Sequence, residues 1–415
     1  MCRIQTWLSH PRAYQISLLV MVVFLLGIFG GALFVLGYDH PYWGDEEHFA
    51  ATVRFFISTP WSQAVQDYPE LTGPLSYLLY AGWGRVFGDS LPVLRLLSLV
   101  LGFAAALIFH RLAYEQTSNP LLALLAGVWL FINPYVIGSS LFVFTDISAL
   151  FFLVLAVWAA LRSRPLAFLA AAAAALLTRQ YLIFFVAVVG GYSAFRWLVH
   201  KERPALWMAI SSVLSCLPLS ALVVVWGGLS PVTGRQLWLH GTSGLAFYPF
   251  YLTNYLSTFP VYAFPFLIMA QRSIFRSINR WMIAIVLSAY YFFFPVAPSW
   301  VTQIETELHT IGYFHRLVKL ISSSSTIEHI IFYLLFVIGI NCLLFLIEDA
   351  WKRLRLRQMD SELLLDLAGI SYFVVMAFSF HVWEKYLLPV LPLLSLRLLM
   401  VPRLLPRWVN QTRPE

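Results

Sequence analysis

Residues 16–37 read ISLLVMVVFLLGIFGGALFVLG and contain no charged side chain. At a rise of about 1.5 Å per residue, a helix of this length crosses the ~30 Å hydrocarbon core of a bilayer. The run is longer than the apolar core of a removable signal peptide and lacks a small-residue cleavage site. It therefore predicts a first membrane-spanning helix.

The composition of the whole chain extends this conclusion. Of 415 residues, 60% are hydrophobic, 17% are aromatic and only 11% are charged, which is outside the range of soluble globular domains. The three cysteines, Cys2, Cys216 and Cys342, are far apart and have no spacing typical of zinc sites or a disulfide framework. We expect an all-α integral membrane protein that forms one polytopic domain over residues 1–415.

Further apolar runs, separated by Gly, Pro and charged residues, predict about 11–13 transmembrane helices. The expected spans are residues 16–37, 91–113, 120–138, 141–160, 165–178, 181–197, 205–226, 246–270, 281–298, 329–348, 363–382 and 386–402.

The distribution of charge predicts which way these spans face. Because basic residues accumulate in cytoplasmic loops, both termini are expected in the cytoplasm. The outer or lumenal face then carries three longer segments, residues 38–90, 227–245 and 299–328, and most of the acidic side chains. The net charge of +7 is therefore a signal of topology, and the expected surroundings are membrane lipids rather than nucleic acid.

The first outer segment contains an amphipathic pattern. Phe49, Val53, Phe56 and Ile57 share one face of a helix at i, i+4, i+7 and i+8. We expect this helix, and the Gly-rich run 72–88, to lie at the membrane interface.

Two adjacent carboxylates, Asp45 and Glu46, precede that helix. One suits a general base that accepts a proton from an attacking hydroxyl, and the other suits a partner that tunes or orients it. The alternative is an ordinary solvated loop.

Asp146 and Arg179 each lie between apolar runs that leave little loop to supply water. Asp146 suits a side chain facing an outer cavity, or an N-cap made with Thr145. Arg179 must pair with an acid, a carbonyl or an anionic ligand, and we favour a ligand phosphate.

Other outer residues have substrate-binding chemistry. His381 and Lys385 lie together before the last apolar run, where Lys385 suits a phosphate contact or interfacial snorkelling. Trp238 and His240 suit a stacking surface and a hydrogen-bonding group for a sugar, although Trp is also a common interface anchor. No spacing of His, Cys, Asp or Glu indicates a metal site, and His309 and His315 match no ligand pattern.

Several short motifs together resemble the GT-C superfamily of membrane glycosyltransferases. The motifs are DE at 45–46, FTD at 144–146, RQ at 179–180, GRQLWLHGTSGLAFYPFYL at 234–252 and HVWEKYLLPVLPLL at 381–394. Within the superfamily they are similar to the dolichyl-phosphate-glucose-dependent α-1,2-glucosyltransferases and to the related protein mannosyltransferase-like group. Lys385 stands where the superfamily usually has Arg before Tyr.

The resemblance implies roles for individual residues. Asp45 would be the catalytic base and Glu46 its neighbour in the site, while Arg179 and Lys385 would contact the donor phosphate. The donor would be a polyprenyl-phosphate sugar, with glucose favoured, and the acceptor a lipid-linked glycan, another lipid or a protein. Attack by an acceptor hydroxyl implies inversion at the sugar carbon, and a phosphate leaving group requires no divalent metal or other cofactor.

Two other classes of protein remain as alternatives. A multi-span transporter also contains buried charges, but its usual internal repeat is not visible here. A non-catalytic membrane scaffold would need none of the outer acids.

Overall fold

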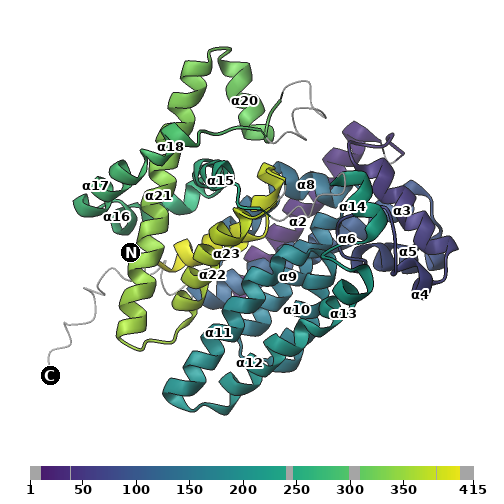
Figure 1. Ribbon diagram of the computed structural model, residues 1–415, viewed down its shortest axis with the longest axis horizontal. Helices are drawn as coiled ribbons and strands as arrows, with labels where there is room; N and C mark the ends of the chain where they lie inside the picture. The colour runs from purple at the N-terminus through teal and green to yellow at the C-terminus, as the bar shows by residue number, and fades with distance from the viewer. Residues whose placement is uncertain (1–10, 38, 240–245, 299–308, 380, 402–415) are drawn as a thin grey trace.

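A computed structural model of the chain describes residues 11–37, 39–239, 246–298, 309–379 and 381–401. These residues form α-helices and two short 3-10 helices, and none of them lies in a strand (Figure 1). The helices are α2 (Pro11–Leu36), α3 (Glu46–Ser58), α4 (Trp61–Ala64), α5 (Leu75–Phe87), α6 (Leu91–Thr117), α7 (Pro120–Phe131), α8 (Pro134–Leu141), α9 (Thr145–Leu161), α10 (Pro165–Thr178), η1 (Gln180–Leu182), α11 (Ile183–His200), α12 (Arg203–Ser215), α13 (Leu217–Trp226), α14 (Val232–Trp238), α15 (Pro249–Tyr262), α16 (Phe264–Ile274), α17 (Ile278–Leu287), α18 (Tyr290–Phe293), α20 (Tyr313–Ile321), α21 (Ser325–Arg355), α22 (Ser361–Met376), η2 (Glu384–Leu387) and α23 (Val390–Met400).

The predicted all-helical membrane class is confirmed, but uninterrupted spans are fewer than expected. In the described residues, five helical stretches are long and apolar enough to cross a membrane: Arg12–Leu36, Leu91–Thr117, Gln180–His200, Arg203–Trp226 and Ser325–Arg355.

The other predicted runs form broken or shorter helices. The run 120–138 divides into α7 and α8, which meet at an angle of 67° and would make a sixth span if counted together. Pro134 begins α8, and a residue that precedes proline is disfavoured in helical geometry, so the break falls at Asn133. Four further apolar stretches of 10–17 residues lie in Thr145–Leu161, Pro165–Thr178, Ile278–Phe293 and Val390–Met400.

The amphipathic helix of the first outer segment is α3, as its periodicity predicts. Its apolar face does not lie against lipid, however, because Phe49, Val53 and Phe56 are buried inside the protein and α3 packs against α5. The expectation of an interfacial helix is corrected in this respect: the apolar stripe joins the core of the protein. The start of α3 is thereby held rigidly against the helix bundle.

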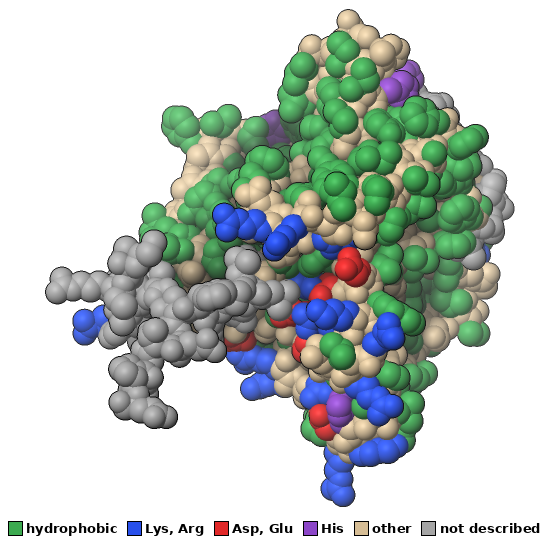
Figure 2. Space-filling model, turned by 90° about the vertical axis from the view of Figure 1, so that its left-hand side faces the viewer, with side chains coloured by type: hydrophobic (Ala, Val, Ile, Leu, Met, Phe, Trp, Pro, Cys, Tyr) green, Lys and Arg blue, Asp and Glu red, His purple; other side chains and the backbone are tan. Residues whose placement is uncertain are grey.

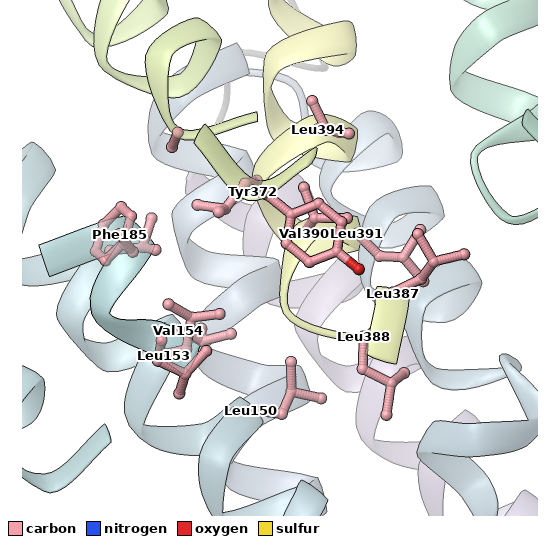
Figure 3. Packing of buried hydrophobic residues seen from close by; sticks show 14 of the residues in the cluster. Leu150, Leu153, Val154, Phe185, Tyr372, Leu387, Leu388, Val390, Leu391 and Leu394 are labelled. Atoms are coloured by element: carbon pink, nitrogen blue, oxygen red, sulfur yellow. The ribbon is translucent and has the colours of Figure 1, made fainter. Parts of the chain in front are cut away.

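Part of the core lies where α9, α11, α22 and α23 meet. Figure 3 shows Tyr372 of α22 among Leu153, Phe185, Leu387 and Leu391, which come from α9, α11, η2 and α23. The hydroxyl of Tyr372 donates a hydrogen bond of 2.7 Å to the carbonyl of Tyr386. This packing fixes η2, the short helix that contains Lys385.

A buried ionic cluster joins the last three helices. Arg397 of α23 is fully buried and donates hydrogen bonds of 2.6 Å to Asp366 of α22 and to Asp349 of α21. Arg353, one turn after Asp349 in α21, bonds to Asp349 and to Asp360 before α22. Since a buried charge is tolerated when it is paired, each of these side chains depends on its partners, and the cluster ties α21, α22 and α23 together.

Charge is unevenly distributed over the surface. In Figure 2, hydrophobic side chains cover most of the upper part of one face, and Lys, Arg, Asp and Glu gather towards its lower end. The α11–α12 and α21–α22 turns lie at that lower end in Figure 1, and they carry basic residues such as Lys201, Arg203, Arg355 and Arg357. This is the end that the sequence predicts to face the cytoplasm.

Candidate functional site

A cavity of about 330 Å³ lies towards the other end of the bundle, between segments that are distant in sequence. Its walls come from the loop before α3, from α8, from the start of α9, from the start of α20 and from η2 with the residue before it. The charged residues in its lining are Asp45, Asp146, Arg316 and Lys385. Aromatic side chains form much of the remaining wall, which is typical of pockets for organic ligands.

Asp45 and Lys385 form an ion pair inside this cavity. The Nζ atom of Lys385 donates to Oδ2 of Asp45 at 3.2 Å, and the side chains of Asp45 and Lys385 are 49% and 20% exposed, respectively. The ammonium group of Lys385 holds the pKa of Asp45 well below its usual range, and His48 lowers it further. Asp45 is therefore an ionised, partly exposed carboxylate.

The imidazole of His48 faces the other carboxylate oxygen of Asp45, the one that is not bonded to Lys385. Its Nε2 atom is 3.9 Å from Oδ1 of Asp45, and its Nδ1 atom is 2.6 Å from Oε1 of Glu70. Burial lowers the pKa of His48, but the carboxylates of Asp45 and Glu70 outweigh it and raise that pKa to about 9. His48 is thus a cation at neutral pH and donates its Nδ1–H to Glu70.

Glu46 has a different position from its neighbour. Its side chain is fully buried, and its oxygens accept bonds from Arg95 at 2.9 and 2.6 Å and from the backbone N–H groups of Trp43 and Val143. Asp45 lines the cavity, whereas the carboxylate of Glu46 is turned towards Arg95 of α6. The expectation of Glu46 as a neighbour inside the site is corrected: it does not line the cavity.

Arg95 extends this buried pair into a support for the loop before α3. Its guanidinium also donates hydrogen bonds to the carbonyls of His40 at 2.7 Å and Pro41 at 3.1 Å. One arginine therefore ties the start of α6 to the middle of the loop that carries Asp45 and to the first residue of α3. Glu46 and Arg95 hold that loop in shape.

Asp146 faces the cavity and pairs with Arg179. Nη2 of Arg179 lies 2.8 Å from Oδ1 of Asp146, and both residues are buried. Helix α9 begins at Thr145 with Phe144 in the cap position, so the N-cap interpretation of Thr145 and Asp146 is wrong. Arg179 is absent from the lining of the cavity and has a protein carboxylate as its partner, contrary to the preference for a ligand phosphate.

Arg316 is a cation of the cavity that sequence reasoning did not single out. It lies in the first turns of α20, and its Nε atom donates to Thr310 at 3.1 Å. The start of α20 is held by the buried carboxylate of Glu384, which accepts bonds from the backbone N–H groups of Phe314 at 3.0 Å and His315 at 2.9 Å. In the sequence, Arg316 belongs to the segment around His309 and His315 that matches no ligand pattern, and nothing there indicates a place in the cavity.

Two other predicted binding residues that the structure describes, Trp238 and His381, do not line the cavity. Trp238 is not in the cavity lining; its indole N–H donates to the carbonyl of Pro69 at 2.8 Å, and its ring packs on His48 at 5.0 Å between centroids. His240 lies outside the described residues. His381 is also absent from the lining, and burial, with Lys385 nearby, lowers the pKa of its imidazole to about 4.

The two histidines considered for metal binding have other surroundings. His315 pairs with Glu328 at 2.6 Å, and His309 is exposed. Across the described part of the chain, no three His, Cys, Asp or Glu side chains gather into a set that could hold a metal ion.

The sequence matches no protein-family profile and no curated protein sequence. Among solved structures, the chain is similar to the crystal structure of ArnT from Cupriavidus metallidurans in the apo state, at 15% sequence identity and a TM-score of 0.42, over 92% of this chain and 78% of that one. At these values the similarity assigns neither a family nor a function.

Proposed function

We propose that this protein is a GT-C-type membrane glycosyltransferase that moves a hexose, with glucose favoured, from a polyprenyl-phosphate donor to a lipid-linked glycan or another acceptor on the outer or lumenal face. The observation that carries this proposal is the cavity in which the carboxylate of Asp45 lies 3.2 Å from Lys385, with Arg316 in the same wall. A base and phosphate-binding cations are the two groups that such a transfer needs side by side.

In the proposed reaction, an acceptor hydroxyl oxygen attacks the anomeric carbon of the donor sugar while Asp45 takes the hydroxyl proton. The bond between the anomeric carbon and the phosphate oxygen breaks, and its electron pair leaves with the polyprenyl phosphate. Lys385 and Arg316 stabilise the negative charge that develops on the phosphate. Attack opposite the leaving group inverts the configuration of the sugar carbon.

Because of the ion pair between Asp45 and Lys385, the donor binds before Asp45 acts as the base. While Lys385 is bonded to Asp45, the carboxylate is a weak base because its pKa is low. A donor phosphate competes for the same ammonium group, so donor binding draws Lys385 away and makes Asp45 more basic. The exposed ring of Trp43, stacked on Phe142 with 5.8 Å between centroids, offers an apolar face to the sugar.

The test uses the full chain in lipid nanodiscs with synthetic polyprenyl-phosphate glucose, with membrane extract as the source of acceptors. The measurement is the appearance of free polyprenyl phosphate by mass spectrometry, which does not depend on which acceptor is used. We expect release by the native chain and its loss in Asp45→Asn. Solute flux across vesicles without any release would favour a transporter instead.

A further inference from the structure

A row of side chains with alternating charges leads from the cavity into the protein. Lys385, Asp45, His48 and Glu70 follow one another, with closest N–O distances of 3.2, 3.9 and 2.6 Å. The 3.9 Å separation between His48 and Asp45 is an electrostatic contact, because it exceeds hydrogen-bond distance. Two cations thus flank the one partly exposed carboxylate of the row.

The inner end of the row is rigid. Glu70 is only 4% exposed, and its backbone lies against Gly234 of α14, where a Cβ atom would come within 2.3 Å of the Glu70 carbonyl oxygen. Trp238, also in α14, bonds to Pro69 and packs its ring beside that of His48, with 5.0 Å between centroids. A second contact between the same segments is the 2.9 Å bond from the backbone N–H of Thr233 to Asp67. Helix α14 therefore clamps the Glu70 loop against α3.

We propose that His48, oriented by Glu70, is a positioning residue that holds the carboxylate of Asp45 in place and ionised when the donor phosphate takes Lys385 away. This inference rests on the proposed transfer function and deepens it. Without a second cation, Asp45 would lose its only ionic partner at the moment it must accept a proton. His48 remains at its side because Glu70 anchors the opposite ring nitrogen.

His48 lies between two carboxylates. The charged groups that face it are Asp45 at the start of α3 and Glu70 in the following loop, while α14 contributes the uncharged ring of Trp238. Removal of His48 alone would leave the buried Glu70 carboxylate without its cation, which destabilises a protein whether or not the residue acts in catalysis. The experiment must therefore separate the two effects.

The first measurement compares donor consumption by His48→Gln, by Glu70→Gln and by the double variant. Replacing both residues removes the unpaired buried charge. A purely structural role of His48 therefore predicts that the double variant recovers the native kcat for donor consumption. The positioning role predicts that it stays at least about tenfold slower in kcat, with the donor KM changed less than about twofold. His329→Gln is the matched control, because His329 is an exposed outer histidine that does not line the cavity.

The second measurement needs no activity. Diethyl pyrocarbonate modifies neutral imidazole, so its reaction with His48, followed by peptide mass spectrometry across pH, reports the pKa of that ring. We expect a midpoint near 9 in the native chain and a lower midpoint, towards the ordinary value of about 6.5, in Glu70→Gln. The alkaline limb of donor consumption should follow the same midpoint.

The possible failures can be told apart. A midpoint near 6.5 in the native chain, or a double variant with native kcat in a preparation where Asp45→Asn is inactive, overturns the role of His48 alone. A native chain that releases no polyprenyl phosphate, with the labelling midpoint still near 9, overturns the transfer function and the positioning role with it.

Discussion

Lys385 and Asp45 are 340 positions apart in the chain, yet Nζ of one lies 3.2 Å from Oδ2 of the other inside a shared cavity. The contact joins η2, which follows α22, to the loop that precedes α3. It places a carboxylate and a cation where one ligand can reach both.

Asp45→Asn removes the proposed base and keeps the shape of the side chain. Because a positioned general base contributes about 10²–10⁴-fold to a rate, we expect kcat for donor consumption to fall by that factor. Asp39→Asn is the control, since Asp39 is an exposed acid of the same loop that does not line the cavity. Equal activity of the two variants would remove Asp45 from the mechanism.

Lys385→Met should weaken donor binding. A hydrogen bond to a charged group contributes about 1.5–3 kcal/mol, which corresponds to a roughly 10- to 100-fold rise in the donor KM. Arg316→Met should act in the same direction, whereas Lys319→Met, one turn further along α20 and outside the cavity lining, should not. Steady-state kinetics with synthetic polyprenyl-phosphate glucose measures all three. A native KM in Lys385→Met would contradict the assignment.

The same substitution should change the pH dependence. Lys385 is the largest cause of the low pKa of Asp45, so without it that pKa rises towards or above its ordinary value of about 4. A base works only when ionised, and the acid limb of kcat/KM, which reports the free enzyme, therefore moves to higher pH in Lys385→Met. A pH–rate profile at donor concentrations well below KM shows the shift, and an unmoved limb would mean that another group controls it.

Glu46 and Glu47 form a matched pair, because they are adjacent acids with opposite environments. Glu46→Gln leaves Arg95 as a buried charge without its carboxylate, a change that typically costs about 3–5 kcal/mol. Glu47 is exposed, and Glu47→Gln should change stability little. Thermal unfolding in detergent followed by light scattering compares the two. Similar midpoints would show that the Glu46–Arg95 pair does not support the loop.

Gly234→Ala tests the clamp on the Glu70 loop. The added Cβ atom would meet the backbone of Glu70 at 2.3 Å, so the loop must shift and the His48–Glu70 contact must loosen. We expect slower donor consumption and a lower labelling midpoint for His48. Gly191→Ala is the control, because nothing lies within 4 Å of its Cβ position. A native midpoint in Gly234→Ala would mean that α14 does not hold this loop.

The helices and the general position of the site follow from local patterns. The uninterrupted apolar runs of α2 and α21 and the i, i+4, i+7 spacing of Phe49, Val53 and Phe56 are readable because burial follows the period of a helix. The acid at position 45, the acid at 146 and the lysine at 385 could be selected as candidates because charges between apolar runs are uncommon. The cavity lining contains all three.

Those local patterns do not predict which charged residues pair with one another across the chain. Glu46 is as acidic as Asp45, but only its bond to Arg95, 49 positions away, shows that it supports the loop. Arg179 is bonded to Asp146, and the proposed role of His48 depends on its bond to Glu70, 22 positions away. The hydrophobic pattern of a helix lies within one short stretch of chain, so the sequence of that stretch is enough to predict it. Which charge meets which is decided by the packing of α3, α6, α14 and η2, whose contacts join segments that the linear order keeps apart.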